Sequence, residues 1–179
     1  MTAPKILLEG KYIRFLNYNS WEYVQRKNCT GIVIILALTR EKKILFTEQY
    51  RVPVGKHVIE FPAGLVNDLG AQEEETLEKA ALRELLEETG YQAKRMIPLV
   101  TGPMNSGLSS DLVSFFRAVG LVKKHDGGGD ETECITVHEV PLQRAETWLR
   151  TMEKRGKLVD PKAYAGLYFL NQRGKKRVN

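Results

Sequence analysis

The chain has 179 residues, of which 42% are hydrophobic and 27% charged, so it can bury a core and has the composition of an ordinary globular protein. Its net charge is only +5, part of it in the basic stretch 173–177, and no basic stripe interleaved with aromatics argues for nucleic-acid binding. No apolar run is long enough to span a bilayer, and two isolated cysteines, Cys29 and Cys134, argue against a zinc site or a disulfide.

From these features we expect a cytoplasmic protein with neither nucleic acid nor membrane as a partner. The N-terminus supports this expectation, because its short apolar stretch is broken by Glu9 and Lys11 and does not resemble a signal peptide.

The first third of the chain predicts β-strands. The run Gly31–Thr39 is almost continuously apolar and rich in β-branched residues, which is typical of a buried strand. Shorter β-prone segments lie on either side of it, and Pro62, Ala63 and Gly64 form a predicted turn. The other predicted strands are 11–18, 21–26, Lys43–Tyr50 and Val58–Phe61.

The period changes to that of a helix between Glu73 and Thr89. Apolar residues then recur at helical spacing, and Gly90 stands where a helix commonly ends. The remaining chain predicts three strands, a glycine-rich flexible loop at 126–130 and two closing helices. The strands are Met96–Val100, Leu112–Gly120 and Ile135–Val140, and the helices are 142–155 and 161–172.

This order of strands and helices indicates an α+β fold or an α/β/α sandwich. The short strands before residue 30 look too small to form a domain of their own. We therefore divide the chain into a small N-terminal β extension, residues 1–29, and a main domain, residues 30–179.

Three glutamates gather on one surface of the predicted helix. Glu84, Glu87 and Glu88 are spaced three and four residues apart, so their like charges repel. A hard divalent cation would turn this repulsion into coordination, since Mg²⁺ prefers carboxylate oxygens. Taken alone, the three glutamates would be better explained as a solvated acidic helix face.

The surrounding sequence resembles the signature of the Nudix hydrolase family. Its core of Arg-Glu-hydrophobic-any-Glu-Glu-any-Gly-hydrophobic matches residues 83–91 without a gap, and Glu75 stands at the upstream glutamate position. One departure is the first glycine, whose expected place is taken by Leu69. Gly64 lies eleven residues before Glu75, which indicates an insertion of about five residues near 67–72.

The resemblance implies an α/β fold, an α/β/α sandwich with a mixed β-sheet, and an enzyme that hydrolyses a nucleoside diphosphate linked to another group. It implies that Glu84, Glu88 and the backbone carbonyl of Ala63 bind Mg²⁺, and that Glu87 is a further ligand or a hydrogen-bond partner of the ligands. Mn²⁺ would be served by the same oxygen ligands. Arg83 would support the glutamates rather than touch the substrate, and Glu75 would be structural or lie outside the metal's own ligands.

Segments outside this signature resemble the branch that cleaves ADP-ribose and ADP-sugars. Residues 60–65, Glu-Phe-Pro-Ala-Gly-Leu, resemble the strand and turn before the signature, and residues 47–51 resemble a strand whose arginine, here Arg51, contacts the diphosphate. Residues 21–26 resemble an N-terminal strand whose tryptophan, Trp21, stacks on the base while its arginine, Arg26, reaches the ligand. Residues 106–110 resemble a loop at the sugar end. The implied substrate-binding residues are Trp21, Arg26, Arg51, Ala63, Met104, Gly107, Leu108 and Ser109.

Each of these segments also has a simpler explanation. Trp21 and Arg26 could cover a sheet, Arg51 could form a surface ion pair, and the 106–110 segment could be any turn.

The general base would come from the segment after the glycine-rich loop. In related enzymes a glutamate on a mobile loop before a late strand takes this role, and residues 130–138 resemble that loop. We take Glu131 as the leading base and Glu133 as a metal ligand or the alternative base, with Glu87 as a further catalytic carboxylate. We expect Glu139 to be solvated and His138 to pack on its strand.

The sequence thus predicts a Mg²⁺-dependent pyrophosphatase that splits a nucleoside diphosphate sugar into a nucleoside monophosphate and a sugar phosphate. The alternatives are a Nudix hydrolase of another nucleotide, such as a dNTP or a dinucleotide, and a Nudix domain that senses nucleotides without cleaving them. In the resembled branch the N-terminal strands complete the partner's site, so we expect a homodimer.

Overall fold

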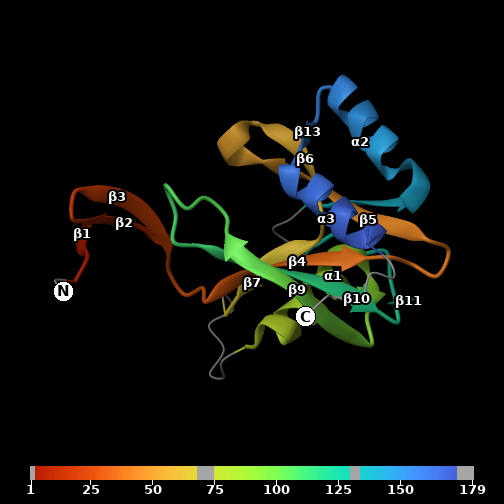
Figure 1. Cartoon of the computed structure of the whole chain (residues 1–179), viewed down its shortest axis with the longest axis horizontal. Helices are drawn as coiled ribbons and strands as arrows, with labels where there is room; N and C mark the ends of the chain where they lie inside the picture. The colour runs from red at the N-terminus through yellow and green to blue at the C-terminus, as the bar shows by residue number, and fades with distance from the viewer. Residues whose placement is uncertain (1–2, 68–74, 130–133, 173–179) are drawn as a thin grey trace.

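The structure is a computed structural model that describes residues 3–67, 75–129 and 134–172. Two four-stranded sheets form its centre, and a separate three-stranded sheet extends to one side (Figure 1). The strands are β1 (Lys5–Glu9), β2 (Ile13–Tyr18), β3 (Trp21–Arg26), β4 (Gly31–Ala37), β5 (Lys43–Arg51), β6 (Lys56–Glu60), β7 (Ala63–Val66), β8 (Tyr91–Gln92), β9 (Arg95–Pro103), β10 (Leu112–Val119), β11 (Val122–Lys123), β12 (Thr136–Pro141) and β13 (Leu158–Val159). The helices are α1 (Leu77–Thr89), α2 (Ala145–Lys154) and α3 (Pro161–Asn171), with 3₁₀ turns at Val52–Val54 and Leu142–Arg144.

Both central sheets are mixed, as the family resemblance implies. The strand orders are β7-β4-β10-β9 and β12-β5-β6-β13, and β8 pairs with β11 in a small ribbon. The pairs β4–β10 and β6–β13 are parallel, whereas the other pairs of the two sheets are antiparallel.

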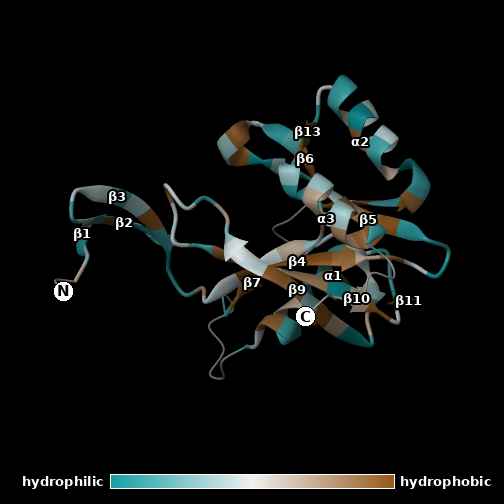
Figure 2. Ribbon diagram, in the orientation of Figure 1, coloured by the Kyte–Doolittle hydropathy of each residue, from teal (hydrophilic) through white to brown (hydrophobic). Residues whose placement is uncertain are grey.

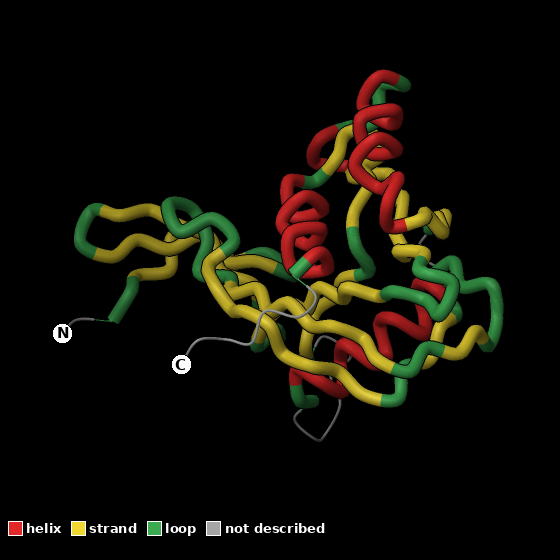
Figure 3. Tube along the Cα trace, turned by 45° about the vertical axis from the view of Figure 1, so that its right-hand side comes forward, coloured by secondary structure: helices red, strands yellow, loops and turns green. Residues whose placement is uncertain are grey.

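Helices cover the sheets on opposite sides, which confirms the predicted sandwich of mixed α/β class (Figure 3). Strand β4 explains why, because its side chains alternate between two apolar clusters. Ile34 and Leu36 pack with residues of α2 and α3, while Val33 and Ile35 pack with residues of α1. A strand buried on both faces reads as an unbroken apolar run, and β4 is brown along its length in Figure 2.

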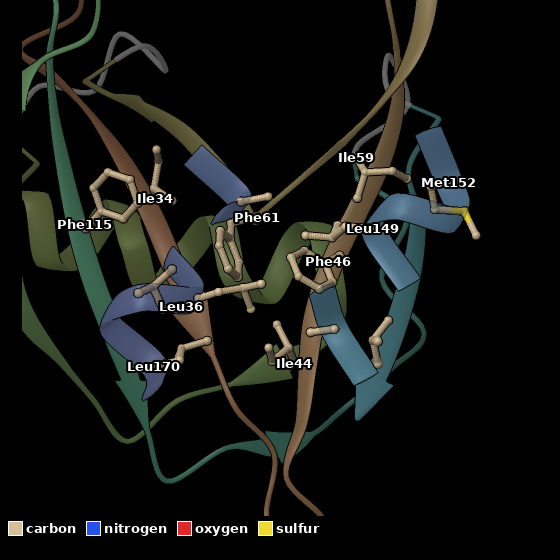
Figure 4. Close-up of a cluster of buried hydrophobic side chains, with 14 of the residues drawn as sticks. Ile34, Leu36, Ile44, Phe46, Ile59, Phe61, Phe115, Leu149, Met152 and Leu170 are labelled. Atoms are coloured by element: carbon tan, nitrogen blue, oxygen red, sulfur yellow. The ribbon is translucent and has the colours of Figure 1, made fainter. Parts of the chain in front are cut away.

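The larger cluster fills the space between the two sheets, α2 and α3. Phe46 from β5 lies in its middle, 4.9 Å from the ring of Phe61 and 5.5 Å from that of Trp148 between ring centroids (Figure 4). Because this cluster joins both sheets, it fixes β5 relative to β4 and thereby positions the two strands that flank the candidate site.

Two predicted boundaries are wrong. The helix begins at Leu77 rather than Glu73, because the side chain of Thr76 caps it by accepting a hydrogen bond from the Lys79 amide. Ala63 and Gly64 do not form a turn but begin β7, where they pair with Ile34 and Val33 of β4. Pairing with a buried strand overrides the local turn preference of Pro-Ala-Gly.

The N-terminal sheet forms an arm, which we define as β1, β2 and β3. The arm includes a strand that the sequence analysis did not predict, β1, whose residues are all exposed. It carries exposed apolar side chains that no other part of the described chain covers: Ile6, Leu7, Leu8, Tyr12, Ile13 and Trp21. In the described residues, no helix combines the length and apolar character needed to cross a membrane.

A buried carboxylate links three elements on the side of the second sheet that faces α2. Glu48 of β5 is only 7% exposed, and its oxygens lie 2.9 Å from Nε2 of His138 on β12 and 3.2 Å from Nδ1 of His57 on β6. Lys157, just before β13, donates a further hydrogen bond to it. Burial raises the pKa of the Glu48 carboxyl, but the hydrogen bonds from Lys157 and His138 outweigh burial and leave this pKa below its ordinary value.

We predict that Lys157→Met lowers the free energy of unfolding at pH 7 by about 2–3 kcal/mol, because it leaves the buried Glu48 carboxylate without its ammonium partner. Since the folded-state pKa of Glu48 is lowered, its contribution is complete above the ordinary pKa of 4.5 and is lost as the pH falls below it. Urea unfolding at several pH values measures both effects. Lys154→Met, at an exposed position of α2, is the matched control and should change stability by less than about 0.5 kcal/mol. Equal stabilities of the two variants would contradict the prediction.

Candidate active site

Helix α1 presents the predicted glutamates on a surface that faces β7. Glu84 and Glu88 are 8% and 4% exposed, whereas the side chain of Glu87 is 47% exposed. Helix side chains tilt toward the N-terminus, so residues four apart lie one above the other. Two of the three carboxylates are therefore desolvated, which an ordinary solvated helix face does not require.

Arg83 binds the acidic groups around it. Its guanidinium donates two hydrogen bonds to Glu75, at 2.9 and 3.1 Å, and one each to Glu84, at 2.8 Å, and Glu87, at 3.1 Å. A further bond of 3.1 Å reaches the carbonyl of Leu65 on β7. The bonds to Glu75 raise the pKa of Arg83, and those from Arg83 lower the pKa of Glu75. Arg83 thus reduces the repulsion that the glutamates would otherwise exert on one another.

Glu75 also closes the base of the predicted insertion. The Glu75 amide donates to the side-chain oxygen of Asn67 at 2.5 Å, and the Asn67 amide donates back to a Glu75 carboxylate oxygen at 3.4 Å. Asn67 adopts a left-handed conformation, with φ at 66°, which asparagine tolerates better than most residues. Of the insertion near 67–72, only Asn67 belongs to the described residues.

Gly64 and Ala63 lie directly against the buried carboxylates. The Ala63 amide donates a hydrogen bond of 3.1 Å to Glu88. A Cβ atom added to Gly64 would lie 1.9 Å from the carboxyl carbon of Glu84, so this carboxylate occupies the space that any side chain at position 64 would need. The glycine therefore permits the close approach of β7 and α1.

The oxygen atoms of this site are of the type that binds a hard divalent cation. Glu84, Glu88 and the backbone of Ala63 supply oxygen ligands on adjoining elements, which is the chemistry that Mg²⁺ or Mn²⁺ prefers. In the arrangement shown, Glu87 is bonded to Arg83, and the described part of the chain contains no group of three His, Cys, Asp or Glu side chains gathered as metal ligands. The fourth predicted carboxylate ligand, Glu133, lies outside the described residues, as does Glu131.

Arg51 lies at the end of β5 and forms an ion pair with Glu60 of β6, with Nε and Oε2 2.7 Å apart. By strand alternation both side chains are on the same sheet face as Leu45, which packs in the cluster of α1. Arg51 is therefore on the face of this sheet that packs toward α1 at Leu45. The sequence analysis missed Glu60 as its partner, although Glu60 is the first residue of the segment 60–65.

The arm brings together the second group of predicted residues. Val24 of β3 pairs with the 104–110 loop through hydrogen bonds to Leu108, at 2.8 Å, and Ser110, at 3.2 Å. Arg26 lies 3.3 Å from the carboxylate of Asp111, whose amide donates to the hydroxyl of Ser109 at 3.0 Å. A cavity of about 220 Å³ lies here between the arm and the main sheet, lined by Arg26, Cys29, Thr30, Ser110 and Asp111 among others.

The structure thus places the predicted site residues in separate groups. Ala63 and the glutamates lie on β7 and α1, Arg51 lies beside Glu60 at the end of β5, and Arg26 and Ser109 lie at the root of the arm. Met104, Gly107 and Leu108 are exposed in the adjacent loop. Trp21 is 60% exposed and lies at the opposite end of β3 from Arg26. Asp111 is the residue of this group that the sequence analysis missed, and its charge directly after the 106–110 loop was the available signal.

Two further predictions about this region have clear outcomes. His138 packs beside Trp148, with ring centroids 5.0 Å apart, and serves Glu48 rather than the α1 glutamates. The expectation that Glu139 is solvated is wrong, because its carboxylate accepts hydrogen bonds from Tyr91 at 2.7 Å and Lys43 at 3.2 Å. These bonds lower the pKa of Glu139.

Comparison with known proteins adds a family to this geometry. Residues 30–161 match the NUDIX domain. The chain is 36% identical over 140 residues to an ADP-ribose pyrophosphatase of Bacillus subtilis and 35% identical over 141 residues to a methanol dehydrogenase activator of Bacillus methanolicus, in each case across 78% of this chain and 71% of the relative. It is 30% identical over 132 residues to a GDP-mannose pyrophosphatase of Escherichia coli, across 72% of this chain and 69% of the relative.

A solved structure described as an ADP compounds hydrolase shares the fold. The TM-score is 0.67 over 96% of this chain and 94% of that chain, at 19% sequence identity. The likeness extends over nearly the whole chain and therefore includes the order of sheets and helices described above.

We predict that Gly64→Ala weakens the binding of Mn²⁺, used as a spectroscopic probe, by at least about tenfold, because the added methyl group must displace the Glu84 carboxylate. Electron paramagnetic resonance of free Mn²⁺ measures the affinity. Gly102→Ala is the matched control, since this strand glycine has no atom within 4 Å of its added Cβ. Unchanged Mn²⁺ affinity in Gly64→Ala would show that Glu84 does not contribute to metal binding.

Proposed function

The chain belongs to the NUDIX family, and from this membership we propose that it hydrolyses the diphosphate of a nucleoside diphosphate sugar, such as ADP-ribose. The products would be a nucleoside monophosphate and a sugar phosphate. The observation that carries the proposal is the α1 site, in which Arg83 bonds to Glu84 and Glu87, while Glu84 and Glu88 are buried beside β7. Relatives of the chain are named as pyrophosphatases of ADP-ribose, ADP-sugar and GDP-mannose, and these names support the substrate class.

Nudix hydrolases generally use divalent metals, and we assign Mg²⁺ to this chain, with Mn²⁺ as an effective substitute. Glu84, Glu87, Glu88, Glu133 and the carbonyl of Ala63 would hold it. When bound, the metal supplies positive charge that neutralises the diphosphate and lowers the pKa of a bound water.

The protein's own groups then bind the substrate and move the proton. Arg51 would bind the diphosphate after exchanging part of its bond to Glu60 for phosphate oxygens, which arginine binds well. A carboxylate oxygen of Glu131, or of Glu133, would accept a proton from water as the water oxygen bonds to phosphorus. The bridging P–O bond breaks at the same centre, and the bridging oxygen leaves with the second phosphate.

The arm would complete the site of a second subunit. Its apolar side chains are exposed, and Trp21 is too far along β3 to belong to the same root as Arg26. We propose a homodimer in which residues 1–29 form the interface and Trp21 stacks on the base, with Arg26, Met104, Gly107, Leu108 and Ser109 at the sugar end. The substrate and the second copy are the partners that we propose, without nucleic acid or membrane, and the proposed location is the cytoplasm.

A substrate panel tests the function. With Mg²⁺, we predict turnover of ADP-ribose or an NDP-hexose at least about a hundredfold more efficient, as kcat/KM, than turnover of dNTPs or dinucleotides. Release of nucleoside monophosphate is measured by chromatography. Turnover of dNTPs alone would overturn the choice of substrate class while leaving hydrolysis in place.

A variant of one carboxylate separates hydrolysis from binding. We predict that Glu84→Gln lowers kcat by at least about a thousandfold, because the neutral amide cannot replace a buried anionic ligand, while ADP-ribose still binds. Glu78→Gln, at an exposed glutamate in the first turn of the same helix, is the matched control and should leave kcat unchanged. Unchanged turnover in Glu84→Gln, with ligand still bound, would show that the catalytic assignment of Glu84 is wrong.

The dimer is tested by mass. We predict that light scattering at micromolar concentration gives twice the chain mass of 20.3 kDa, and that Leu8→Asp gives a monomer because a charge in an apolar interface is strongly unfavourable. Tyr168→Asp, at a similarly exposed aromatic residue of α3, should remain dimeric. A monomeric wild-type chain would contradict the proposed interface.

A further inference from the structure

The glycine-rich segment before β12 is bonded to the C-terminal end of α1. We define residues 124–129 as the glycine strap. The amides of Lys124 and His125 donate to the carbonyl of Gly90 at 2.8 and 3.3 Å. Further along, the Gly128 amide donates to the Glu88 carbonyl at 2.9 Å, and the Gly129 amide to the Glu87 carbonyl at 3.2 Å. The strap therefore satisfies carbonyls in the last turn that have no partner within the helix.

Glycine is required for this contact at specific places. Gly127 has φ at 74°, and a Cβ atom there would lie 2.4 Å from the Glu88 carbonyl oxygen and 2.5 Å from the Thr89 carbonyl carbon. Both contacts are with backbone, so no side-chain rotation relieves them. The glycines that the sequence analysis interpreted as a source of flexibility are thus used for close approach.

The strap also holds the end of the segment that returns to β12. The Ile135 amide donates to the Gly128 carbonyl at 3.1 Å, and Ile135 is buried. Gly128 therefore joins two elements at once, since its amide bonds to α1 and its carbonyl bonds to the residue before β12. Gly129 and Cys134, the described residues on either side of 130–133, are each adjacent to a strap bond.

We propose that Gly127, Gly128 and Gly129 are positioning residues. They hold the two flanks of the segment that carries Glu131 and Glu133 next to α1, the helix that carries the three glutamates. This inference rests on the proposed function, because it assigns the strap a part in hydrolysis. The bonds reach the backbone carbonyls of Glu87 and Glu88 themselves. One helix thus anchors the described residues on both sides of 130–133, and the strap would act through the general base rather than by contact with substrate.

Gly127→Ala tests the proposal with Gly156→Ala as its matched control. Gly156 is also left-handed, with φ at 84°, but its added Cβ meets no atom within 4 Å. Both variants carry the backbone strain of alanine at positive φ, whereas only Gly127→Ala pushes the strap from α1. We expect kcat for ADP-ribose to fall 10- to 100-fold in Gly127→Ala, as for a displacement of about 1 Å, with KM changed by less than about threefold. Gly156→Ala should keep the wild-type kcat, and an equal loss in both variants would overturn the proposal.

A double-mutant cycle shows whether the strap acts through the general base. The effect of Gly127→Ala is measured again in Glu131→Gln and in Glu133→Gln, and we expect it to disappear in whichever of these variants lowers kcat. A purely structural defect would lower kcat by the same factor in every background and would overturn the proposal. It would be overturned equally if neither glutamine variant lowers kcat.

Hydrogen exchange tests the strap without any reaction. In the wild-type, metal-free chain we expect the amides of Gly128 and Gly129 to exchange at least about 100-fold more slowly than in an unfolded peptide. Exchange at the unfolded rate would overturn the proposal, even if the Gly127→Ala chain does not fold. A chain that shows this protection but cleaves no nucleoside diphosphate sugar would disprove the proposed function and leave the strap in place.

Discussion

The carboxylates of α1 can share one surface because a single guanidinium lies among them. Arg83 bonds to Glu75, Glu84 and Glu87 and, through the carbonyl of Leu65, to the strand opposite. Without this cation, burying Glu84 next to its neighbours would cost desolvation and repulsion together. The close packing of β7 on α1, which requires glycine at position 64, is compatible with a charged Glu84 only because that charge is already compensated. The other features of the site follow from this packing.

The sequence predicts the parts of the fold that local pattern determines. The buried strand β4, helix α1 with Gly90 at its end, and the mixed α/β class follow from periodicity and composition, and the structure confirms them. The strands β1, β7, β8, β11 and β13 were not predicted. They are short or exposed, or consist of residues typical of turns, and they become strands only because a neighbour offers hydrogen bonds.

The candidate site divides in the same way. The glutamates share a helix face because of their spacing, which sequence alone contains. The partner of Arg51 is 9 positions away in the chain, that of Arg26 is 85 positions away, and the most distant partner of Glu48 is 109 positions away. No local pattern could therefore identify these partners. The glycine run shows the opposite difficulty. Its composition is visible, but whether glycine serves mobility or close contact depends on what lies next to it.

The hydrogen bonds between Asn67 and Glu75 separate the size of a loop from the geometry of the helix that follows it. The chain leaves and returns at one closed pair of residues, with Glu75 already bound to Arg83. Residues can therefore be added or removed between 67 and 75 without displacing α1, since the entropic cost of closing a longer loop grows only slowly with its length. The point at which this sequence departs from its family signature is thus also a natural place to graft a foreign peptide, such as an affinity epitope or a reporter.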